Sequence, residues 1–585
     1  MNYQKNYNLS FSLVEVLIGV TFIAILSYLI YMGFINFMKF SSAVRIQLQA
    51  LNLLENELEL IRNLKYEDVG IIGGYPRGIL EPKKIVEYGP YKFEIRTYVR
   101  NIDDPFDGTV TTTPKDTAPA DYKLVELEAD CLNCTIKIKT QKLTSIVAPK
   151  TLEATTNNGS LFIQVFDASG KPVSLANVLV VNNKIDPPIK IEDITNVNGL
   201  LQLIDIPTGT NAYEITVSKP GYSTDKTYPV NDPNNPNPIN PHATVIEQGL
   251  TIVSFSIDKL SNLNIYTQDK FCKPLGNIDF KIIGNKLIGT NPNIPKFTTT
   301  TLTDSNGYKF LPNLEWDEYI FEILKQGYVL SGALQVLPFR LLPDKNETVN
   351  LIVTTSSPNY LLVQVLDENN NPLDFATVTL TGTNYNKTLI TEVNEIFEED
   401  WIDNYSEKTD NIDLSFGDVR LKNYDDVYPT GTEEYLISRT IDLGTTTDSK
   451  ILKIEWDANI PENTLLKIQI AVNNDNSTWN FVGPDGTSQT YFTISPSENL
   501  EFTVDKRFIR YKVYLTTYDE NLTPKLNNIK FKYKNFCLSK NYVLFDNLQA
   551  GSYNLIVEKT GYLSTSIQID LLNQFHFITV KLTRE

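Results

Sequence analysis

The most apolar part of the chain lies near its amino-terminal end. Residues 16–38 carry no charge, and Glu15 is the one charged residue between Leu13 and Met38. A run of 23 uncharged residues is long enough to cross a bilayer as a helix. No small-residue cleavage site of the signal-peptide kind follows Met38, so the pattern predicts a retained membrane anchor.

Beyond this segment, the apolar positions change to the spacing of an amphipathic helix. They recur in steps of three and four residues, which places them on a single helix face. These positions are Val44, Leu48, Leu51, Leu54, Leu58, Ile61 and Leu64. The two segments together predict one continuous helix over residues 12–64, roughly 80 Å long at 1.5 Å per residue. Its outer half would hold a small head domain against one face.

Alternating apolar and polar positions predict three strands after this helix, at residues 91–100, 122–128 and 135–143. Such a sheet, ending near residue 149, would complete the head. The turn after the first of these strands contains three carboxylates, which are the kind of ligand that Ca²⁺ takes. They belong to Asp103, Asp104 and Asp107 and form a candidate calcium site. Their spacing does not match an EF-hand, and a turn rich in Asp and Gly needs no metal.

From residue 158 onward the chain repeats one pattern of short strands and turns. Each unit opens with an apolar strand beginning at Leu161, Leu263 or Leu361, and a proline follows 11 residues later. Each unit also ends alike, with the sequence Lys-x-Gly-Tyr at residues 219–222, 325–328 and 559–562. Strands of period two that are interrupted by Asn-Gly and Pro turns predict small antiparallel β-sandwiches.

The third unit is interrupted by an insert. Its opening strand and its closing Lys-x-Gly-Tyr are 198 residues apart, against 58 and 62 residues in the other two units. The difference predicts an inserted domain at 398–535. This insert contains Trp401, Trp456 and Trp479, which are three of the four tryptophans. Exposed tryptophans would suit a sugar-binding face, but three in one domain also suit a hydrophobic core.

The charge and the histidine content exclude some classes of function. Lys and Arg total 52 and Asp and Glu total 70, so the 585-residue chain has a formal net charge of −18. This balance argues against nucleic-acid binding, which needs a basic face. The two histidines, His242 and His576, are far apart in the sequence. With no nucleophile–base pattern and no phosphate-binding loop, we expect no enzymatic activity and no cofactor other than calcium.

The four cysteines suggest disulfide chemistry outside the cell. Cys131 and Cys134 form a CxxC motif, which a local disulfide, a redox pair or half of a zinc site can use. A zinc site would need a second pair, and a redox enzyme would need a βαβ pattern that the chain lacks, so we predict a local disulfide. Whether Cys272 bonds Cys537 cannot be read from the sequence.

The sequence Ser10-Phe11-Ser12-Leu13-Val14-Glu15-Val16-Leu17-Ile18 resembles the processing site of type IV prepilins and pseudopilins. The resemblance implies that a prepilin peptidase cuts before Phe11 and methylates its new amine, although Ser10 stands where the family has Gly. It also implies that Glu15, then the fifth residue, pairs with the terminal ammonium of a neighbouring subunit. Residues 61–70 resemble the end of this helix in minor pilins of the type IV pilus modification kind.

The repeat units resemble carboxypeptidase-regulatory-like domains of the transthyretin type, which are non-catalytic spacers or binding modules. Residues 479–487 and 508–515 of the insert resemble a discoidin-like or jelly-roll sandwich of bacterial surface proteins. These resemblances, with the hydrophobic pattern, give a set of predicted boundaries. They are a prepilin leader at 1–10, a helix at 11–64, a pilin-like head at 65–150, repeat units at 158–258, 259–355 and 358–397 plus 536–585, and the insert at 398–535.

The predicted fold is therefore mainly β, with one long amino-terminal transmembrane and amphipathic helix, a small α+β head and several antiparallel β-sandwiches. The predicted function is that of a minor pilin or pseudopilin that presents a large extracellular contact module. Its partners would be other pilin subunits, the prepilin peptidase, the membrane through a single helix, and glycans or proteins of another cell surface. The alternative is a membrane-anchored surface adhesin that never enters a filament.

Overall fold

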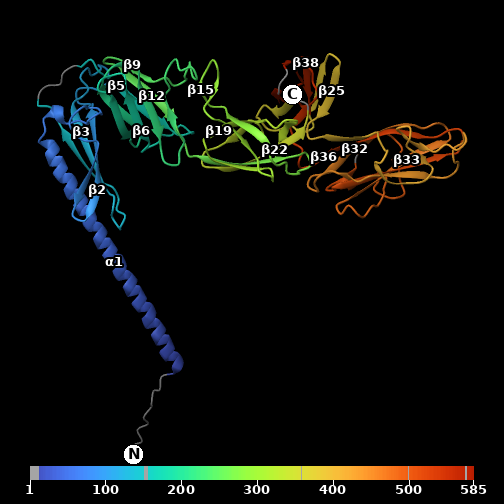
Figure 1. The fold of residues 1–585 in the computed structure, drawn as a ribbon, viewed down its shortest axis with the longest axis horizontal. Coiled ribbons are helices and arrows are strands. Elements are labelled where there is room, and N and C mark those ends of the chain that lie inside the picture. The colour runs from blue at the N-terminus through green and yellow to red at the C-terminus, as the bar shows by residue number, and fades with distance from the viewer. Residues whose placement is uncertain (1–11, 151–155, 357–358, 499, 573–575) are drawn as a thin grey trace, which may run out of the picture. The chain divides into compact units, whose positions relative to one another are not determined.

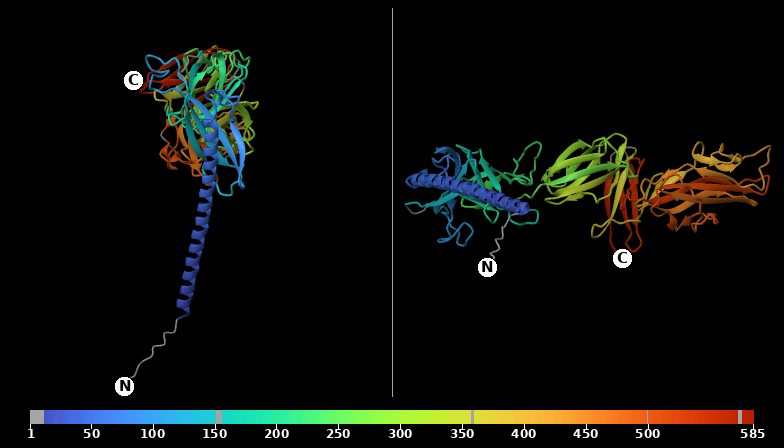
Figure 2. Two further views of the ribbon diagram at one scale, coloured as in Figure 1. Left: turned by 90° about the vertical axis from the view of Figure 1, so that its left-hand side faces the viewer. Right: turned by 90° about the horizontal axis from the view of Figure 1, so that it is seen from below.

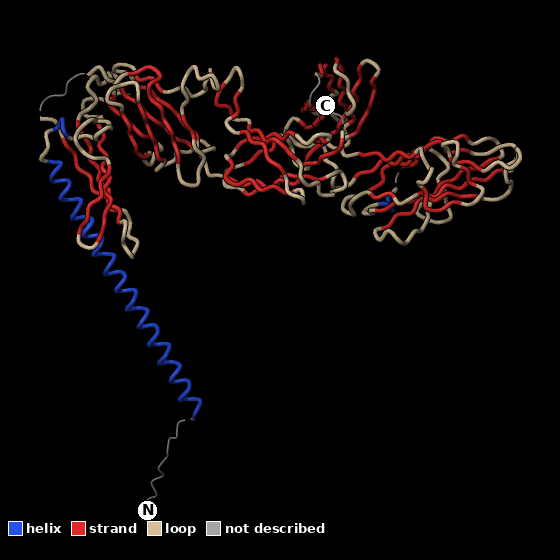
Figure 3. The backbone as a smooth tube through the Cα atoms, in the orientation of Figure 1, coloured by secondary structure: helices blue, strands red, loops and turns tan. Residues whose placement is uncertain are grey.

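The structure is a computed structural model that describes residues 12–150, 156–356, 359–498, 500–572 and 576–585. Strands hold 48% of the residues and helices 10%, which confirms the predicted mainly β fold. Figure 3 shows that regular structure after the first helix is almost entirely strand. The chain divides into two compact units: Met1–Lys259 with Ile288–Ile294, and Leu260–Leu287 with Pro295–Glu585.

The first unit begins with α1 (Leu13–Arg62), a single helix of 50 residues, as the sequence predicted. Ser12 caps its amino-terminal end and Asn63 its carboxyl-terminal end. Figures 1 and 2 show that the last part of α1 lies against the head sheet, whereas the earlier part projects away from it. Almost every side chain from Leu13 to Phe40 is exposed, which is the arrangement that a surrounding membrane or neighbouring helices would cover.

The buried face of α1 differs from the predicted one at its start. Leu54, Leu58 and Ile61 are buried as predicted, but Val44 and Leu48 are 36% and 55% exposed. The side chains that contact the sheet in these turns are Ile46, Ala50 and Leu53. The helix therefore turns a second apolar face, starting at Val44 and Leu48, away from its own head. Periodicity alone cannot tell which of two apolar faces packs inside the subunit.

The head sheet has four antiparallel strands in the order β1-β2-β3-β4. Their bounds are β1 (Lys83–Tyr88), β2 (Tyr91–Ile102), β3 (Tyr122–Cys131) and β4 (Gln141–Val147). The third strand lies further along the chain than the predicted 135–143, because the chain turns through residues 132–140 and pairs with β3 only from Gln141, opposite Ala129. A buried lysine fastens the helix end to the sheet: Lys123 Nζ donates to the carbonyls of Tyr66, in η1 (Tyr66–Asp68), and of Val69, at 2.8 and 2.7 Å.

A first sandwich completes this unit. One sheet has the order β12-β5-β8, and the other has the order β10-β9-β6-β7 with β11 paired to β9. Their bounds are β5 (Gly159–Phe166), β6 (Asn177–Asn182), β7 (Ile189–Ile194), β8 (Leu200–Ile206), β9 (Gly209–Ser218), β10 (Asp225–Lys226), β11 (Ala243–Val245) and β12 (Leu250–Ser256). The core between the sheets is built from side chains of Leu161 to Ile257.

The second unit opens with a second sandwich. Its sheets have the orders β18-β13-β22-β20 and β17-β14-β19-β21. Their bounds are β13 (Ser261–Gln268), β14 (Asp279–Gly284), β17 (Thr298–Leu302), β18 (Tyr308–Leu314), β19 (Asp317–Ile323), β20 (Tyr328–Ala333), β21 (Phe339–Leu341) and β22 (Asn346–Thr355). The short strands β15 (Leu287–Gly289) and β16 (Ile294–Pro295) pair with each other, and most of their residues belong to the first unit.

A third sandwich is built from two separate stretches of the chain. Its sheets have the orders β37-β23-β40 and β25-β24-β38-β39. Their bounds are β23 (Leu361–Asp367), β24 (Thr377–Gly382), β25 (Tyr385–Ile390), β37 (Tyr542–Phe545), β38 (Gly551–Glu558), β39 (Thr565–Leu571) and β40 (His576–Leu582). In all three sandwiches the opening strand pairs in parallel with a late strand, as β5–β12, β13–β22 and β23–β40.

Between β25 and β37 the chain forms another sandwich, the insert. One sheet has the order β28-β29-β36-β32-β34 with β26 paired to β36, and the other has the order β27-β30-β35-β31 with β33 paired to β35. Their bounds are β26 (Asn394–Glu398), β27 (Tyr405–Lys408), β28 (Ile412–Asp413), β29 (Val419–Leu421), β30 (Glu434–Ser438), β31 (Ile441–Asp442), β32 (Lys450–Asn459), β33 (Thr464–Asn473), β34 (Ser497–Glu498), β35 (Phe508–Thr517) and β36 (Lys525–Lys534), with a short helix η2 (Glu501–Thr503).

Candidate functional site

The residues of the predicted processing site lie at the start of α1. Ser10 and Phe11 lie outside the described residues. Glu15 is described, and its carboxylate Oε2 accepts a bond from the Ser12 backbone N–H at 2.9 Å, while its own N–H donates to Ser12 Oγ at 3.2 Å. This reciprocal capping box satisfies the helix start within one chain. Among the described helices, α1 is the one that is long and apolar enough to cross a membrane.

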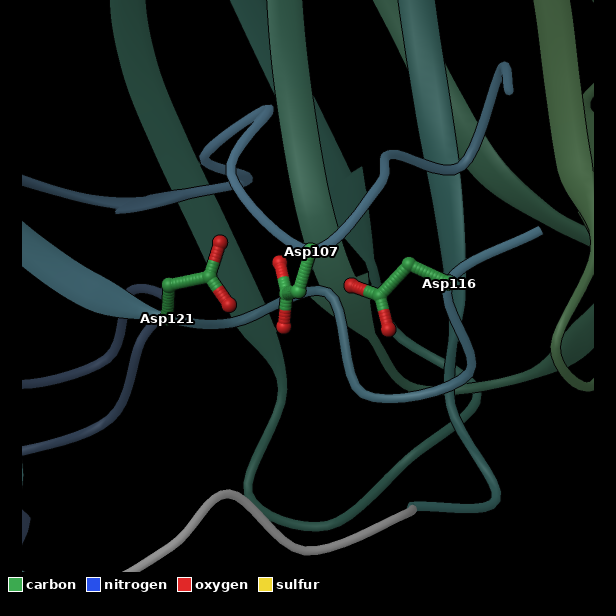
Figure 4. Close-up of side chains that lie close together, drawn as sticks. All are labelled: Asp107, Asp116 and Asp121. Carbon is green, nitrogen blue, oxygen red and sulfur yellow. The ribbon is translucent and has the colours of Figure 1, made fainter. Parts of the chain in front are cut away.

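Three carboxylates converge in the long loop between β2 and β3 of the head. Oxygen atoms of Asp107, Asp116 and Asp121 all lie within 4.8 Å of one another, and Figure 4 shows the three side chains side by side. Oxygen donors of this kind suit Ca²⁺. In the described part of the chain, this is the one group of three or more acidic, histidine or cysteine side chains close enough to share a cation.

Of the three aspartates predicted for calcium, only Asp107 belongs to this group. The Asp104 carboxylate instead accepts from the Phe106 backbone N–H at 3.0 Å and shapes the turn. The Asp103 carboxylate accepts from the Val110 N–H at 2.8 Å. Burial, together with the neighbouring carboxylates of the cluster, raises the pKa of Asp103 to about 6. Asp103 therefore lies against the cluster and responds to its negative charge.

Asp116 and Asp121 were missed because the prediction took one short turn rather than the whole loop. The loop folds back on itself: the Thr109 carbonyl accepts from the Asp116 N–H at 3.2 Å, and the Asp104 N–H donates to the Asp121 carboxylate. A count of every carboxylate between the two predicted strands would have included both residues.

The head is joined to the first sandwich through a half-buried arginine. Arg100 on β2 donates to both carboxylate oxygens of Asp193 on β7, and to Glu126 on β3 at 2.9 Å. Burial would lower the pKa of Arg100, but these bonds outweigh burial and raise it. Cavities of about 420 and 310 Å³ lie beside this pair, and both are lined from the head and the sandwich. The sequence offered no signal for this contact.

Two disulfides account for all four cysteines. The structure joins Cys131 to Cys134, with Cα atoms 5.7 Å apart. It also joins Cys272 to Cys537, with Cα atoms 5.4 Å apart across a separation of 265 residues. The second bond connects the bend after β13, in the second sandwich, to the chain just beyond the insert.

The three tryptophans of the insert differ in their surroundings. Trp401 is 1% exposed and its indole N–H donates to the Tyr511 hydroxyl at 2.7 Å, so its prediction as a sugar-binding residue was wrong: it is part of the core. Trp456 is half-buried and packs against the same core. Trp479 is also half-buried, and the Arg510 guanidinium lies 4.4 Å from the centre of its ring.

No protein-family model and no curated protein sequence matches the chain. Among solved structures, the Bacillus anthracis TIE protein matches with 11% identity and a TM-score of 0.16, over 86% of this chain and 74% of that one. The streptococcal ancillary pilin matches with 11% identity and a TM-score of 0.14, over 73% and 99%. The major pilin subunit BcpA of Bacillus cereus matches with 10% identity and a TM-score of 0.21, over 55% and 99%. Likenesses at these TM-scores carry no argument about this chain.

Proposed function

We propose that the chain is a type IV pilin-like subunit whose helix α1 enters a filament or its membrane platform, and whose β-sandwiches form a contact module outside the cell. The observation that carries the proposal is the difference in burial between the two ends of α1. Its last turns pack on the head, whereas its first 28 residues (Leu13–Phe40) are exposed almost throughout and carry only two charges, on Glu15 and Lys39. A subunit that inserts a helix into a shared helical core needs this arrangement, and the adjacent prepilin-like sequence provides the means of processing.

Within this proposal the subunit is a minor one. Its partners are other pilin subunits and a prepilin peptidase, and it is anchored by a single membrane pass before assembly. The amount of chain beyond the head supports a place at the filament tip, because modules of this size would crowd neighbours along a shaft. The formal charge of −18 argues against a role in DNA uptake.

The first test is the amino terminus of the mature protein. Mass spectrometry of the protein purified from its native membrane should find a chain that starts at a methylated Phe11. Because Ser10 stands where the prepilin family has Gly, Ser10→Gly should increase the processed fraction. A terminus that remains at Met1 in both proteins would contradict the proposal.

The second test is incorporation into filaments. Glu15→Gln removes the one charge between Leu13 and Met38 and should reduce the amount recovered in sheared filaments at least tenfold, with membrane insertion unchanged. Glu55→Gln on the exposed face of the same helix is the matched control and should assemble normally. Equal recovery of the two variants would contradict a role of Glu15 in assembly.

One observation favours the alternative of a surface adhesin that never enters a filament. The carboxylate of Glu15 is already bonded to the Ser12 N–H within the same chain, so it does not need a partner subunit. The mature amino terminus distinguishes the two functions, since a plain anchor keeps its original start.

For either function we propose the insert as the contact surface, and an acidic glycan as its partner. Trp479 and Arg510 support this, because a half-buried ring beside a cation suits a sugar that carries a carboxylate. The full-length protein in detergent should bind acidic glycans on an array. Trp479→Ala should abolish this binding and Trp456→Ala should retain it. Absence of binding by the parent protein would indicate a spacer role.

A further inference from the structure

The bend between β13 and β14 has an unusual residue at its tightest point. Cys272 has a φ of 60°, in the left-handed region that glycine and asparagine tolerate best. The equivalent positions in the first and third sandwiches are Gly170, with a φ of 79°, and Asn370, with a φ of 66°. A cysteine costs backbone energy at this position, which glycine or asparagine would avoid.

The bend lies against the insert, within the second compact unit. Phe271 packs on the core of the insert, and a Cβ added at Gly444 would lie 2.5 Å from the Cα of Phe271, so the two backbones are in direct contact. The buried amide of Asn535 donates to the carbonyls of Lys270, at 3.2 Å, and Leu443, at 2.7 Å. Two residues further on, Cys537 is fully buried and bonded to Cys272.

We propose that the Cys272–Cys537 bond is a strap that carries tension directly between the second sandwich and the insert. Tension on the insert then bypasses the strands β14 to β22 and the whole third sandwich. The source of the tension rests on the proposed contact function, since a bound surface would pull on the insert while α1 holds the other end. The covalent route itself does not depend on that function.

Without the strap, tension would run along the backbone and through the third sandwich. That sandwich is assembled from strands on both sides of the insert, with β23 paired to β37 and β40, and β24 paired to β38. A pull on the insert through β25 would draw β23 to β25 away from their partners and split the sandwich. With the Cys272–Cys537 bond in place, tension passes from β13 to β36, and neither half of the third sandwich lies on this route.

The strap also connects two strands that can bear tension without unfolding. On one side is β13, which lies between β18 and β22 and is already extended, so a pull along it adds little length. On the other side is β36, an inner strand of the insert that pairs with β26, β29 and β32. Tension therefore passes from one inner strand to another.

The test is single-molecule stretching of the full chain in detergent micelles. Peptide handles are inserted at Gly170, where a side chain would meet no neighbour, and at Asp485, in an exposed turn of the insert. Along the backbone 213 residues separate Cys272 from Asp485, but only 52 separate Asp485 from Cys537. The strap therefore shortens the route by 161 residues, roughly 560 Å at about 3.5 Å per residue.

Each molecule is stretched before and after addition of a thiol reductant. The Cys131–Cys134 bond lies outside the stretched segment, so the comparison needs no substitution that could impair folding. We expect the reductant to lengthen the fully extended chain by roughly 560 Å. We also expect new unfolding events from the second and third sandwiches.

Equal extended lengths in the two states would overturn the proposal, and so would a gain in length from β14 to β25 before reduction. A C272S/C537S variant, if it folds, should reproduce the reduced state without reductant. The result is independent of filament assembly, because a chain that is never processed at Phe11 should give the same lengths.

Discussion

The turn after the opening strand of each sandwich has the same construction but different uses in the first and second sandwiches. In the first, Asp167 Oδ1 accepts from the N–H groups of Ser169 and Lys171, at 2.8 and 2.9 Å. In the second, Asp269 Oδ1 accepts from the equivalent residues Phe271 and Lys273, at the same distances. In both turns the next proline bridges back to the end of the opening strand.

The difference lies in the two residues that these bonds hold at the tip. The first sandwich has Ser169 and Gly170 there, both exposed. The second has Phe271, which packs on the insert, and Cys272, which bonds to Cys537. The comparison teaches that the carboxylate fixes the shape of the turn, while the tip residues are free to take on contacts. Four predictions test this division.

The largest effect is expected from removal of the strap. C272S/C537S should lower the free energy of unfolding of the second unit by about 4 kcal/mol, because the bond closes a very long loop. The Cys131–Cys134 bond closes a much shorter loop, with a separation of 3, so C131S/C134S should cost about half as much or less, and only in the head. All four tryptophans lie in the second unit, so tryptophan fluorescence during urea unfolding measures this unit selectively. Equal fluorescence transitions for the two variants would contradict the role of the strap.

The next largest effect is expected at Phe271. Phe271→Ala removes a ring that packs on the core of the insert, and we expect a loss of about 2 kcal/mol in the second unit. Ser169→Ala, the equivalent change in the first sandwich, affects an exposed side chain and should change stability by less than about 0.5 kcal/mol. Urea unfolding followed by fluorescence and circular dichroism measures both. A loss at Phe271 no greater than that at Ser169 would show that the tip residue contributes little.

A smaller effect is expected from the residue type at position 272, where the backbone has a positive φ. C272G/C537S should be more stable than C272S/C537S by about 1 kcal/mol, because glycine adopts a positive φ without steric cost. Fluorescence-monitored unfolding of the two strapless proteins under identical conditions gives the difference. Equal stabilities of the serine and glycine proteins would show that the backbone at this position does not oppose a side chain.

The smallest effect concerns the carboxylate of the first turn. Burial alone would raise the pKa of the Asp167 carboxyl, but hydrogen bonds from Ser169 and Lys171 outweigh burial and lower it. The group therefore stabilises the fold above its unfolded pKa of about 3.9, and this contribution is lost as the pH falls through the folded pKa.

After allowance for solvent screening, Asp167→Asn should cost about 0.3 kcal/mol at pH 7 and nothing at pH 2. Hydrogen exchange of the β5 amides in variant and parent measures the difference, with Glu247→Gln at an exposed position of the same sandwich as a control for general charge effects. A difference that persists at pH 2 would point to lost bonding rather than to titration.

The sequence was most informative where one physical rule governs a long segment. The helix α1 was predicted to within two residues at each end, because an apolar run and a helical period agree over its whole length. The strand β1 was not predicted. Its side chains alternate between exposed and half-buried, so its hydrophobic contrast is weak. The choice between Val44 and Ile46 for the buried face depended on the position of the sheet, which local periodicity does not contain.

The candidate sites were less predictable because they depend on how the loops fold. Asp107 was found by its place in an acidic turn, but its partners Asp116 and Asp121 come from further along the loop. The pairing of Cys272 with Cys537 depends on where the insert leaves the third sandwich. The place of Trp401 in the core could not be decided beforehand, because composition does not distinguish a buried indole from an exposed one.

The pairing of β26 with β36 has a consequence for the history of the chain. These strands open and close the insert, and they run side by side, with Asn394 opposite Tyr533 and Glu398 opposite Ile529. A domain whose two ends are adjacent can be gained, lost or exchanged by recombination without changing the host sandwich. We therefore expect related chains to keep the three sandwiches while carrying different domains at this position. Replacement of the insert alone would then change what the protein binds.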